Sequence, residues 1–190
     1  MKHELATLRT KEMLAESLKK KMCKKPLSKI TVSELIEDCD LNRRTFYYHF
    51  EDLYALVAWM FDQEAVELLK KSDSCLTWDE GVLLVLQYVQ KNEPLCKCAL
   101  DGLGREYLRK FFKDDALNIT GNIVRELAAG LTIDKKFIDF LTVFYTSALA
   151  ETLIRWMSNG MKETPQELVD MLEITLHGNV RAALERAARK

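Results

Sequence analysis

Hydrophobic positions recur every three or four residues along most of the chain, the spacing that gathers them on one face of an α-helix. The first such pattern predicts a helix over about residues 7–23, which Pro26 ends. A second, longer pattern predicts a helix over about residues 52–71. Strands are not indicated, because glycine and proline are few and helix-forming residues dominate. We therefore expect an all-α protein.

Between these two helices the sequence ITVSEL carries the start signal of a short helix over about residues 31–39. Thr31 is expected to cap this helix and Glu34 to close a capping box with it. After a tight turn, Asn42 is placed to cap a third helix, which has the sequence LNRRTFYYHF. Helix, turn and helix in this order are the outline of a helix-turn-helix.

The third helix has one apolar face and, pointing away from it, a face with polar and charged side chains. At about 100° per residue, Phe46 and Phe50 share the apolar face, while Arg44, Thr45 and Tyr48 point away from it. Arginine can donate two hydrogen bonds to guanine, threonine can touch a thymine methyl group, and tyrosine or histidine can donate to phosphate. The arrangement is typical of a recognition helix in the DNA major groove, although the tyrosines alone are also compatible with packing on neighbouring helices.

Charge is distributed unevenly, although the whole chain carries a net charge of −1. Residues 1–30 contain nine basic and three acidic side chains, so the remainder of the chain is acidic. A basic end on an acidic chain suits a polyanionic partner that contacts only that end. A lysine-rich helix that simply faces solvent explains the charge equally well.

The order of these helices and the motif TFYYHF resemble the DNA-binding domain of TetR/AcrR-family transcriptional regulators, over about residues 6–56. The resemblance implies a three-helix DNA-binding domain over residues 1–50 and a helical effector and dimerisation domain over residues 51–190. It also implies roles for the matching positions. Those expected to read bases are Arg43, Arg44, Thr45 and Tyr48, those expected to hold phosphates are Tyr47 and His49, and those expected to rest on the DNA backbone are Thr31 and Ser33.

Two positions depart from the family pattern. Asp40 stands where the family usually has a turn glycine, a replacement that aspartate tolerates because it adopts left-handed turns more readily than most residues. Leu53 stands where the family often has a lysine, which removes one expected phosphate contact. Loss of that contact is expected to lower both the affinity for DNA and its salt dependence, unless the basic first helix compensates.

The end of the chain predicts two more helices. Residues 134–159 carry two apolar stripes, more than a single-domain core explains, and TPQEL restarts a final helix with Thr164 as cap and Glu167 closing the box. Two such helices from each of two chains would form a four-helix bundle. The sequence WMSNGMKETPQELVDML also resembles a TetR subgroup that includes regulators of dihydroxyacetone-kinase operons. The expected dimer interface is formed by Phe140, Ser147, Ile154, Leu172, Leu176, Gly178 and Ala183.

The family resemblance implies a homodimer on a palindromic operator in double-stranded DNA, more often a repressor than an activator, controlled by a small-molecule effector or by a partner protein. An effector cavity would be lined by Trp59, Tyr88, Phe111, Tyr145, Glu151 and Trp156. The competing interpretation is that these aromatic residues belong to the hydrophobic core and that Glu151 lies at a solvent-exposed edge of the dimer.

An enzyme is not indicated, because the sequence lacks GxSxG, P-loop, HExxH and Gly-rich dinucleotide motifs. No cofactor or metal is expected: of five scattered cysteines only Cys96 and Cys98 have a spacing that resembles a metal pair, and reduced core thiols explain them better. Polar residues interrupt the apolar stretches, so we expect no membrane association and a cytoplasmic protein. The alternative function is a helical protein–protein adaptor that has lost DNA binding.

Overall fold

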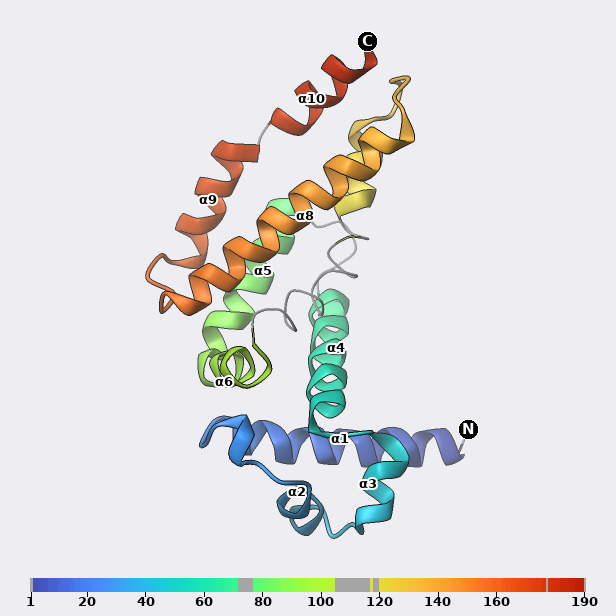
Figure 1. Cartoon of the computed structure of the whole chain (residues 1–190), viewed down its shortest axis with the longest axis vertical. Helices are drawn as coiled ribbons and strands as arrows, with labels where there is room; N and C mark the ends of the chain where they lie inside the picture. The colour runs from blue at the N-terminus through green and yellow to red at the C-terminus, as the bar shows by residue number, and fades with distance from the viewer. Residues whose placement is uncertain (1, 72–76, 105–116, 118–119, 177, 190) are drawn as a thin grey trace. The chain divides into compact units, whose positions relative to one another are not determined.

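The computed structural model describes residues 2–71, 77–104, 117, 120–176 and 178–189. In this part of the chain every regular element is helical, which confirms the all-α expectation (Figure 1). Eight of the elements lead from the N-terminus to the end of the longest helix: α1 (Lys2–Met22), η1 (Leu27–Lys29), α2 (Val32–Asp38), α3 (Arg43–His49), α4 (Leu53–Lys71), α5 (Trp78–Lys91), α6 (Glu93–Leu103) and α8 (Lys135–Ser158). Two shorter helices follow, α9 (Pro165–Leu176) and α10 (Asn179–Ala188).

The chain divides into two compact units. The first comprises residues 1–75 together with 92–104, and therefore contains α1 to α4 and α6. The second comprises residues 76–91 together with 105–190, and contains α5, α8, α9 and α10. The expected functional boundary at residue 50 lies inside the first unit, so the compact body that carries the helix-turn-helix is larger than the helix-turn-helix itself.

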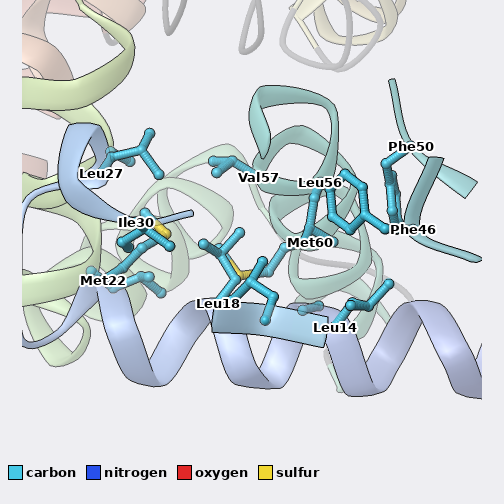
Figure 2. Close-up of a cluster of buried hydrophobic side chains, with 14 of the residues drawn as sticks. Leu14, Leu18, Met22, Leu27, Ile30, Phe46, Phe50, Leu56, Val57 and Met60 are labelled. Atoms are coloured by element: carbon cyan, nitrogen blue, oxygen red, sulfur yellow. The ribbon is translucent and has the colours of Figure 1, made fainter. Parts of the chain in front are cut away.

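The core of the first unit is built on one face of α1. Leu14 and Leu18 are fully buried, and they point toward Leu56 and Val57 of α4 (Figure 2). Leu14 and Leu18 are four residues apart, so they share one face of α1. The same cluster includes Phe46 of α3, so the position of the third helix is fixed by the packing of α1 and α4.

Helix α6 joins the first unit although it lies far from α1 in the sequence. It packs against α1 and η1, and its Leu95 and Ala99 belong to the same buried cluster. The approach is close: a Cβ atom added at Gly102 would lie 2.6 Å from the Cβ atom of Leu27. Only glycine fits at this position without a shift in the backbone of one of the two elements.

In the second unit, α9 packs on α5, and α10 packs on α8 and α9. Leu184 of α10 is fully buried beside Leu141 of α8, and Arg181 donates a hydrogen bond from Nη1 to the carbonyl oxygen of Leu127, 2.6 Å away. The sequence pattern predicted a single final helix, and this prediction was wrong. The helix breaks at Gly178, which adopts a left-handed conformation (φ 72°), and the chain continues as α10 (Figure 1).

The expected signals at the junction of α8 and α9 are present. Helix α8 ends at the sequence NG, where Gly160 is left-handed (φ 82°) and the N–H of Met161 donates to the carbonyl oxygen of Trp156. At the start of α9, Thr164 and Glu167 exchange the hydrogen bonds of a capping box. Both predictions are confirmed.

Candidate nucleic-acid interface

The N-terminus of α2 is held by the predicted capping box. The backbone N–H of Thr31 donates to Glu34 Oε2 at 2.9 Å, and the N–H of Glu34 donates to Thr31 Oγ1 at 3.3 Å. The Lys25 ammonium group forms an ion pair with Glu34 Oε1. The ion pair and the hydrogen bonds from Thr31 lower the pKa of Glu34 from 4.5 to about 2. Glu34 therefore stays ionised at neutral pH and ties the residues before α2 to its first turn.

Asp40 makes the turn between α2 and α3 in the way that the sequence predicted. Its φ is 52°, in the left-handed region, where aspartate is tolerated better than most residues. The N–H of Asp40 donates to the carbonyl oxygen of Glu37, and the N–H of Leu41 donates to that of Ile36 at 2.8 Å. This pair of bonds is a Schellman motif, which satisfies the last carbonyl groups of α2 and fixes the direction in which the chain enters α3.

Helix α3 is anchored at both ends. Asn42 caps it, because Asn42 Oδ1 accepts a hydrogen bond from the N–H of Thr45 at 2.8 Å and another from the Thr45 hydroxyl at 3.1 Å. Phe46 is 0% exposed, and Phe50, which follows the last turn, is also buried and packs edge-on against Trp59 of α4. The apolar face predicted for this helix is confirmed, and it holds the opposite face outward.

The outward face carries the residues that the sequence singled out. Tyr47 is 48% exposed and Tyr48 is 72% exposed, values that are high for aromatic side chains in a folded protein. Arg43 and Arg44 are exposed as well. The remaining candidates lie around them, with Thr31 and Ser33 exposed and Thr45 and His49 half-buried.

Arg43 and Tyr47 contact each other on this face. The guanidinium carbon of Arg43 lies 5.7 Å from the centre of the Tyr47 ring, and Arg43 Nη2 approaches the Tyr47 hydroxyl oxygen at 3.4 Å. The Tyr47 ring in turn rests edge-on against the ring of Phe46, with 5.3 Å between the ring centres. A sequence reading cannot detect this contact, because arginine and tyrosine four residues apart on a helix have many rotamers in which they do not meet.

The basic first helix is less available to a polyanion than its charge predicts. Lys19 is paired with Glu64 of α4 at 2.6 Å, and Lys21 with Asp38 of α2 at 2.8 Å. The Lys21 ammonium group, followed by the Ser17 hydroxyl, lowers the pKa of Asp38. These lysines bind neighbouring helices within the first unit. Part of the positive charge at the N-terminus is therefore held in ion pairs within the first unit, so neither a polyanionic partner nor a helix that simply faces solvent is needed to explain it.

Lys11 has a different environment. Its ammonium nitrogen lies over two aromatic rings, 5.4 Å from the centre of Phe50 and 5.6 Å from the centre of Trp59. Such contacts stabilise a cation against an aromatic face. Trp59, which the sequence assigned to an effector cavity, is thereby part of the core that supports α3.

A known protein family matches the part of the chain that follows α4. Residues 76–178 match a TetR family model described as a transcriptional regulator C-terminal region. The match spans more than half of the chain and includes α5, α6, α8 and α9. The chain belongs to the TetR family of transcriptional regulators. A TetR-type regulator is the class of protein that the helix-turn-helix and the motif TFYYHF predicted.

Two similar proteins carry related names. The TetR-family chain is 27% identical over 84 residues to the "HTH-type dhaKLM operon transcriptional activator DhaS" of Lactococcus lactis subsp. lactis (strain IL1403), an alignment that covers 44% of this chain and 45% of that protein. A solved structure named "Dihydroxyacetone kinase operon activator DhaS" has the same fold, with a TM-score of 0.69, 19% identity, and coverage of 91% of this chain and 97% of the other. Both are named as regulators of transcription and not as enzymes, in agreement with the sequence analysis.

The residues expected to line an effector cavity fall into both units. Trp59 lies in the first, whereas Tyr88, Tyr145, Glu151 and Trp156 lie in the second, and Phe111 lies outside the described residues. Tyr145 packs against the cluster around Leu141. Trp156 is buried, and its indole N–H donates to the carbonyl oxygen of Glu163 at 2.9 Å. These contacts describe core packing, and the cavity stays a prediction.

The residues expected at a dimer interface differ in exposure. Phe140 and Ser147 are exposed, and Leu172 and Leu176 are half-buried on a helix that packs on α5. Ile154 is fully buried within its own protomer and cannot contact a second copy, so this assignment needs correction. Ala183 packs against the core between α8 and α10, and Gly178 is the exposed break between α9 and α10.

Besides Phe140, the second unit exposes several apolar side chains that the sequence pattern did not assign to the dimer interface. Phe144 is 54% exposed and Phe140 is 59% exposed, and the rings of Phe137, Phe140 and Phe144 stack in a row with 6.2 Å and 6.0 Å between neighbouring centres. Val143 lies beside them, and Met171 and Ile174 are exposed on α9. The two stripes on α8 were assigned from periodicity alone, and periodicity does not tell which stripe the rest of the protomer covers.

The pair Cys96 and Cys98 has the character of structural thiols. Burial raises the pKa of Cys96 to about 12, and the Cys98 thiol donates to the carbonyl oxygen of Lys25 at 3.5 Å. Across the described parts of the chain, the His, Cys, Asp and Glu side chains form no group of three that could hold a metal ion.

Proposed function

We propose that this TetR-family regulator binds a palindromic DNA operator as a homodimer, with α3 of each protomer in the major groove. The observation that carries the proposal is the outward face of α3, where Arg43, Arg44, Tyr47 and Tyr48 are exposed above the buried anchor Phe46. Arginines on a rigidly held helix can donate to guanine or to phosphate, and tyrosines can donate to phosphate. The surrounding candidates, Thr31, Ser33, Thr45 and His49, are assigned to the same contact surface.

Dimerisation is proposed through an apolar face of the second unit. This dimer face is made of Phe140, Val143, Phe144 and Ser147 on α8, with Met171 and Ile174 on α9. Contiguous exposed apolar side chains mark interaction sites, and the rings of Phe140 and Phe144 stack on each other. By length and composition alone α8 is also apolar enough to cross a membrane, and only 22% of its most apolar window is buried in the protomer. A second copy of the chain explains the exposed face of a DNA-binding protein better than a membrane does, and we place the protein in the cytoplasm with the DNA.

Control by a small-molecule effector or a partner protein is proposed from the family. A feature of α8 supports a small molecule: Thr146 is 2% exposed, and its hydroxyl has no hydrogen-bond partner among the described residues. A buried hydroxyl without a partner costs about 1–3 kcal/mol, which a polar group of a bound ligand would offset.

The sign of regulation has two candidates. Repression is the mode that the sequence analysis expects, since repressors are the more frequent members of the family. Activation is the second candidate, and it is favoured because both similar proteins are named as activators. Transcription in vitro from a template with its operator, with and without the protein, distinguishes an increase in transcript from a decrease.

The proposal is tested by fluorescence anisotropy with DNA from upstream of the gene for this chain and of its neighbours, at two salt concentrations. The wild-type protein is expected to bind one such fragment specifically, and more weakly at the higher salt concentration. The double variant Arg44→Ala with Tyr48→Ala should lose at least about tenfold in affinity for that fragment, because each removed contact is worth about 1–3 kcal/mol.

A suitable control is Glu51→Gln, an exposed residue just beyond α3. It changes a charge next to the recognition helix without removing any proposed contact, so it should bind the fragment at least as tightly as wild type. Absence of specific binding by the wild-type protein, with and without extracts that contain candidate effectors, would favour the adaptor function instead.

A further inference from the structure

We propose that Arg43 and Tyr47 form a preassembled clamp for one DNA phosphate, and that Arg44 is the arginine that reads a base. This assignment rests on the proposed DNA binding and departs from the role that the family resemblance gives to Arg43. It identifies Tyr47 as a positioning residue for Arg43 in addition to its own contact with phosphate.

The clamp is built outward from the core. Phe46 is fully buried and presents its ring to Tyr47, with 5.3 Å between the centres and an angle of 84° between the planes. Edge-to-face packing of this kind restricts the orientation of the outer ring. The Tyr47 ring then provides the face over which the Arg43 guanidinium group lies, 5.7 Å from the ring centre. A flexible surface arginine is thereby held in one region of space before DNA arrives.

The polar atoms of the clamp complement an anion. Arg43 Nη2 approaches the Tyr47 hydroxyl oxygen at 3.4 Å, so that oxygen acts as the acceptor and its own O–H remains available as a donor. The guanidinium group keeps further N–H donors for the same anion. A phosphate oxygen can accept from both groups, whereas the edge of a base offers acceptors in a pattern that suits one undistorted arginine fork.

Arg44 differs from its neighbour. It is exposed and lies about 100° further around the helix than Arg43, with Tyr48 one turn beyond it. One of the two adjacent arginines is therefore placed against the sugar-phosphate backbone, and the other is left to enter the groove. Sequence alone gives the two arginines the same role, because both are long enough to reach either target.

The test compares variants on two DNA duplexes, one selected by the wild-type protein from a random-sequence library and one scrambled duplex of the same composition. Arg43→Ala is expected to weaken binding to both duplexes by a similar factor, and to reduce the slope of log affinity against log salt concentration by about 1. Arg44→Ala is expected to weaken binding to the selected duplex by about tenfold or more while changing the scrambled duplex much less.

Coupling between the two residues is measured with a double-mutant cycle. Tyr47→Phe removes the hydroxyl and keeps the ring against Phe46, so the fold is preserved. The double variant Arg43→Ala with Tyr47→Phe should lose affinity by a clearly smaller factor than the product of the factors measured for the two single variants. The matched control replaces Tyr48 by phenylalanine, and its effect should multiply with that of Arg43→Ala.

The outcomes separate this inference from the proposed function. If the wild-type protein selects a duplex but Arg43→Ala affects only that duplex, the clamp is wrong and Arg43 is a base reader. If the Arg43 and Tyr47 effects multiply without coupling, the clamp is also wrong, because the two residues act independently. If the wild-type protein selects no duplex from the library, the proposed specific DNA binding is wrong, and the phosphate clamp, which depends on it, is wrong as well.

Discussion

The Glu34 carboxylate shows how one residue links local and tertiary structure. It closes the capping box with Thr31, a partner three residues away, and it binds Lys25, a partner from before η1. The capping box was predictable, because its two residues are close in sequence and belong to a known pattern. The ion pair was not, since the approach of Lys25 depends on the path of the chain through η1.

Because Glu34 stabilises α2 only in its ionised form, it makes the stability of the protein depend on pH in the acidic range. The pKa of Glu34 in the folded protein, about 2, lies below its ordinary value of 4.5. The stabilisation is therefore fully present above pH 4.5 and is lost as the pH falls toward 2. We expect Glu34→Gln to have a lower thermal midpoint than wild type at pH 7, and this gap to shrink as the pH falls through that window, as measured by circular dichroism.

Glu37→Gln is the matched control, because it removes a carboxylate from the same helix without touching the capping box. It should lower the midpoint at pH 7 by less than Glu34→Gln does. Equal midpoints for the two variants would mean that loss of charge, and not loss of the box and its ion pair, determines the stability of α2.

At the scale of elements, the sequence predicted the start and type of most helices because caps and periodicity are local properties. It failed at the junction of α9 and α10, where the apolar positions continue in register across Gly178. The break coincides with the left-handed Gly178, after which Leu184 of α10 is fully buried in the cluster that contains Leu141 of α8. It also gave no sign that α6 joins the first unit, because that contact is made between segments about 75 residues apart.

The contact between α6 and η1 can be tested with two glycines. Gly102→Ala is expected to destabilise the protein by about 1–3 kcal/mol, since the new Cβ atom would lie 2.6 Å from that of Leu27. Gly81→Ala is the control, because this helical position has nothing within 4 Å of a new Cβ atom. It should stabilise α5 by about 0.5–1 kcal/mol.

Urea unfolding monitored by circular dichroism measures both effects. A stabilising effect of Gly102→Ala equal to that of Gly81→Ala would mean that α6 does not approach η1 closely in solution.

At the scale of the whole molecule, the sequence indicated more apolar surface on α8 than one protomer needs, and that inference agrees with the exposed row of phenylalanine rings. It assigned Ile154 to the wrong surface because burial inside a protomer and burial against a second copy produce the same helical periodicity. The candidate DNA-contacting residues were named from a local motif. Arg43, Arg44, Tyr47 and Tyr48 are exposed on α3, whereas Thr31 and Ser33 are exposed at the start of α2. Whether they contact DNA in the proposed way stays a prediction.

The dimer face is tested by its aromatic row. The double variant Phe140→Ser with Phe144→Ser is expected to convert a wild-type dimer into a monomer at micromolar concentration, since it removes two large exposed apolar side chains from the proposed interface. Size-exclusion chromatography with light scattering measures the mass. Met13→Ser, which replaces an apolar residue of α1 that is also exposed, should leave the dimer intact.

A wild-type protein that is monomeric across this concentration range would contradict the assignment of the dimer face. Loss of the dimer in Met13→Ser would place the interface on the first unit instead.

The chain leaves the first unit after residue 75 and returns to it at residue 92, which limits how segments of this regulator can be exchanged with those of a relative. Residues 1–75 and 92–104 make one compact body, and α5 interrupts them. A hybrid regulator that takes only the first 75 residues would leave behind Leu95 and Ala99, and would uncover the apolar surface that they fill. If α1 to α4 are exchanged between such proteins, in the laboratory or in evolution, the α6 of the recipient must therefore fit the apolar surface of the new helices. The helices proposed to contact DNA and the second unit belong to different compact bodies, but these bodies do not lie on separate, continuous lengths of chain.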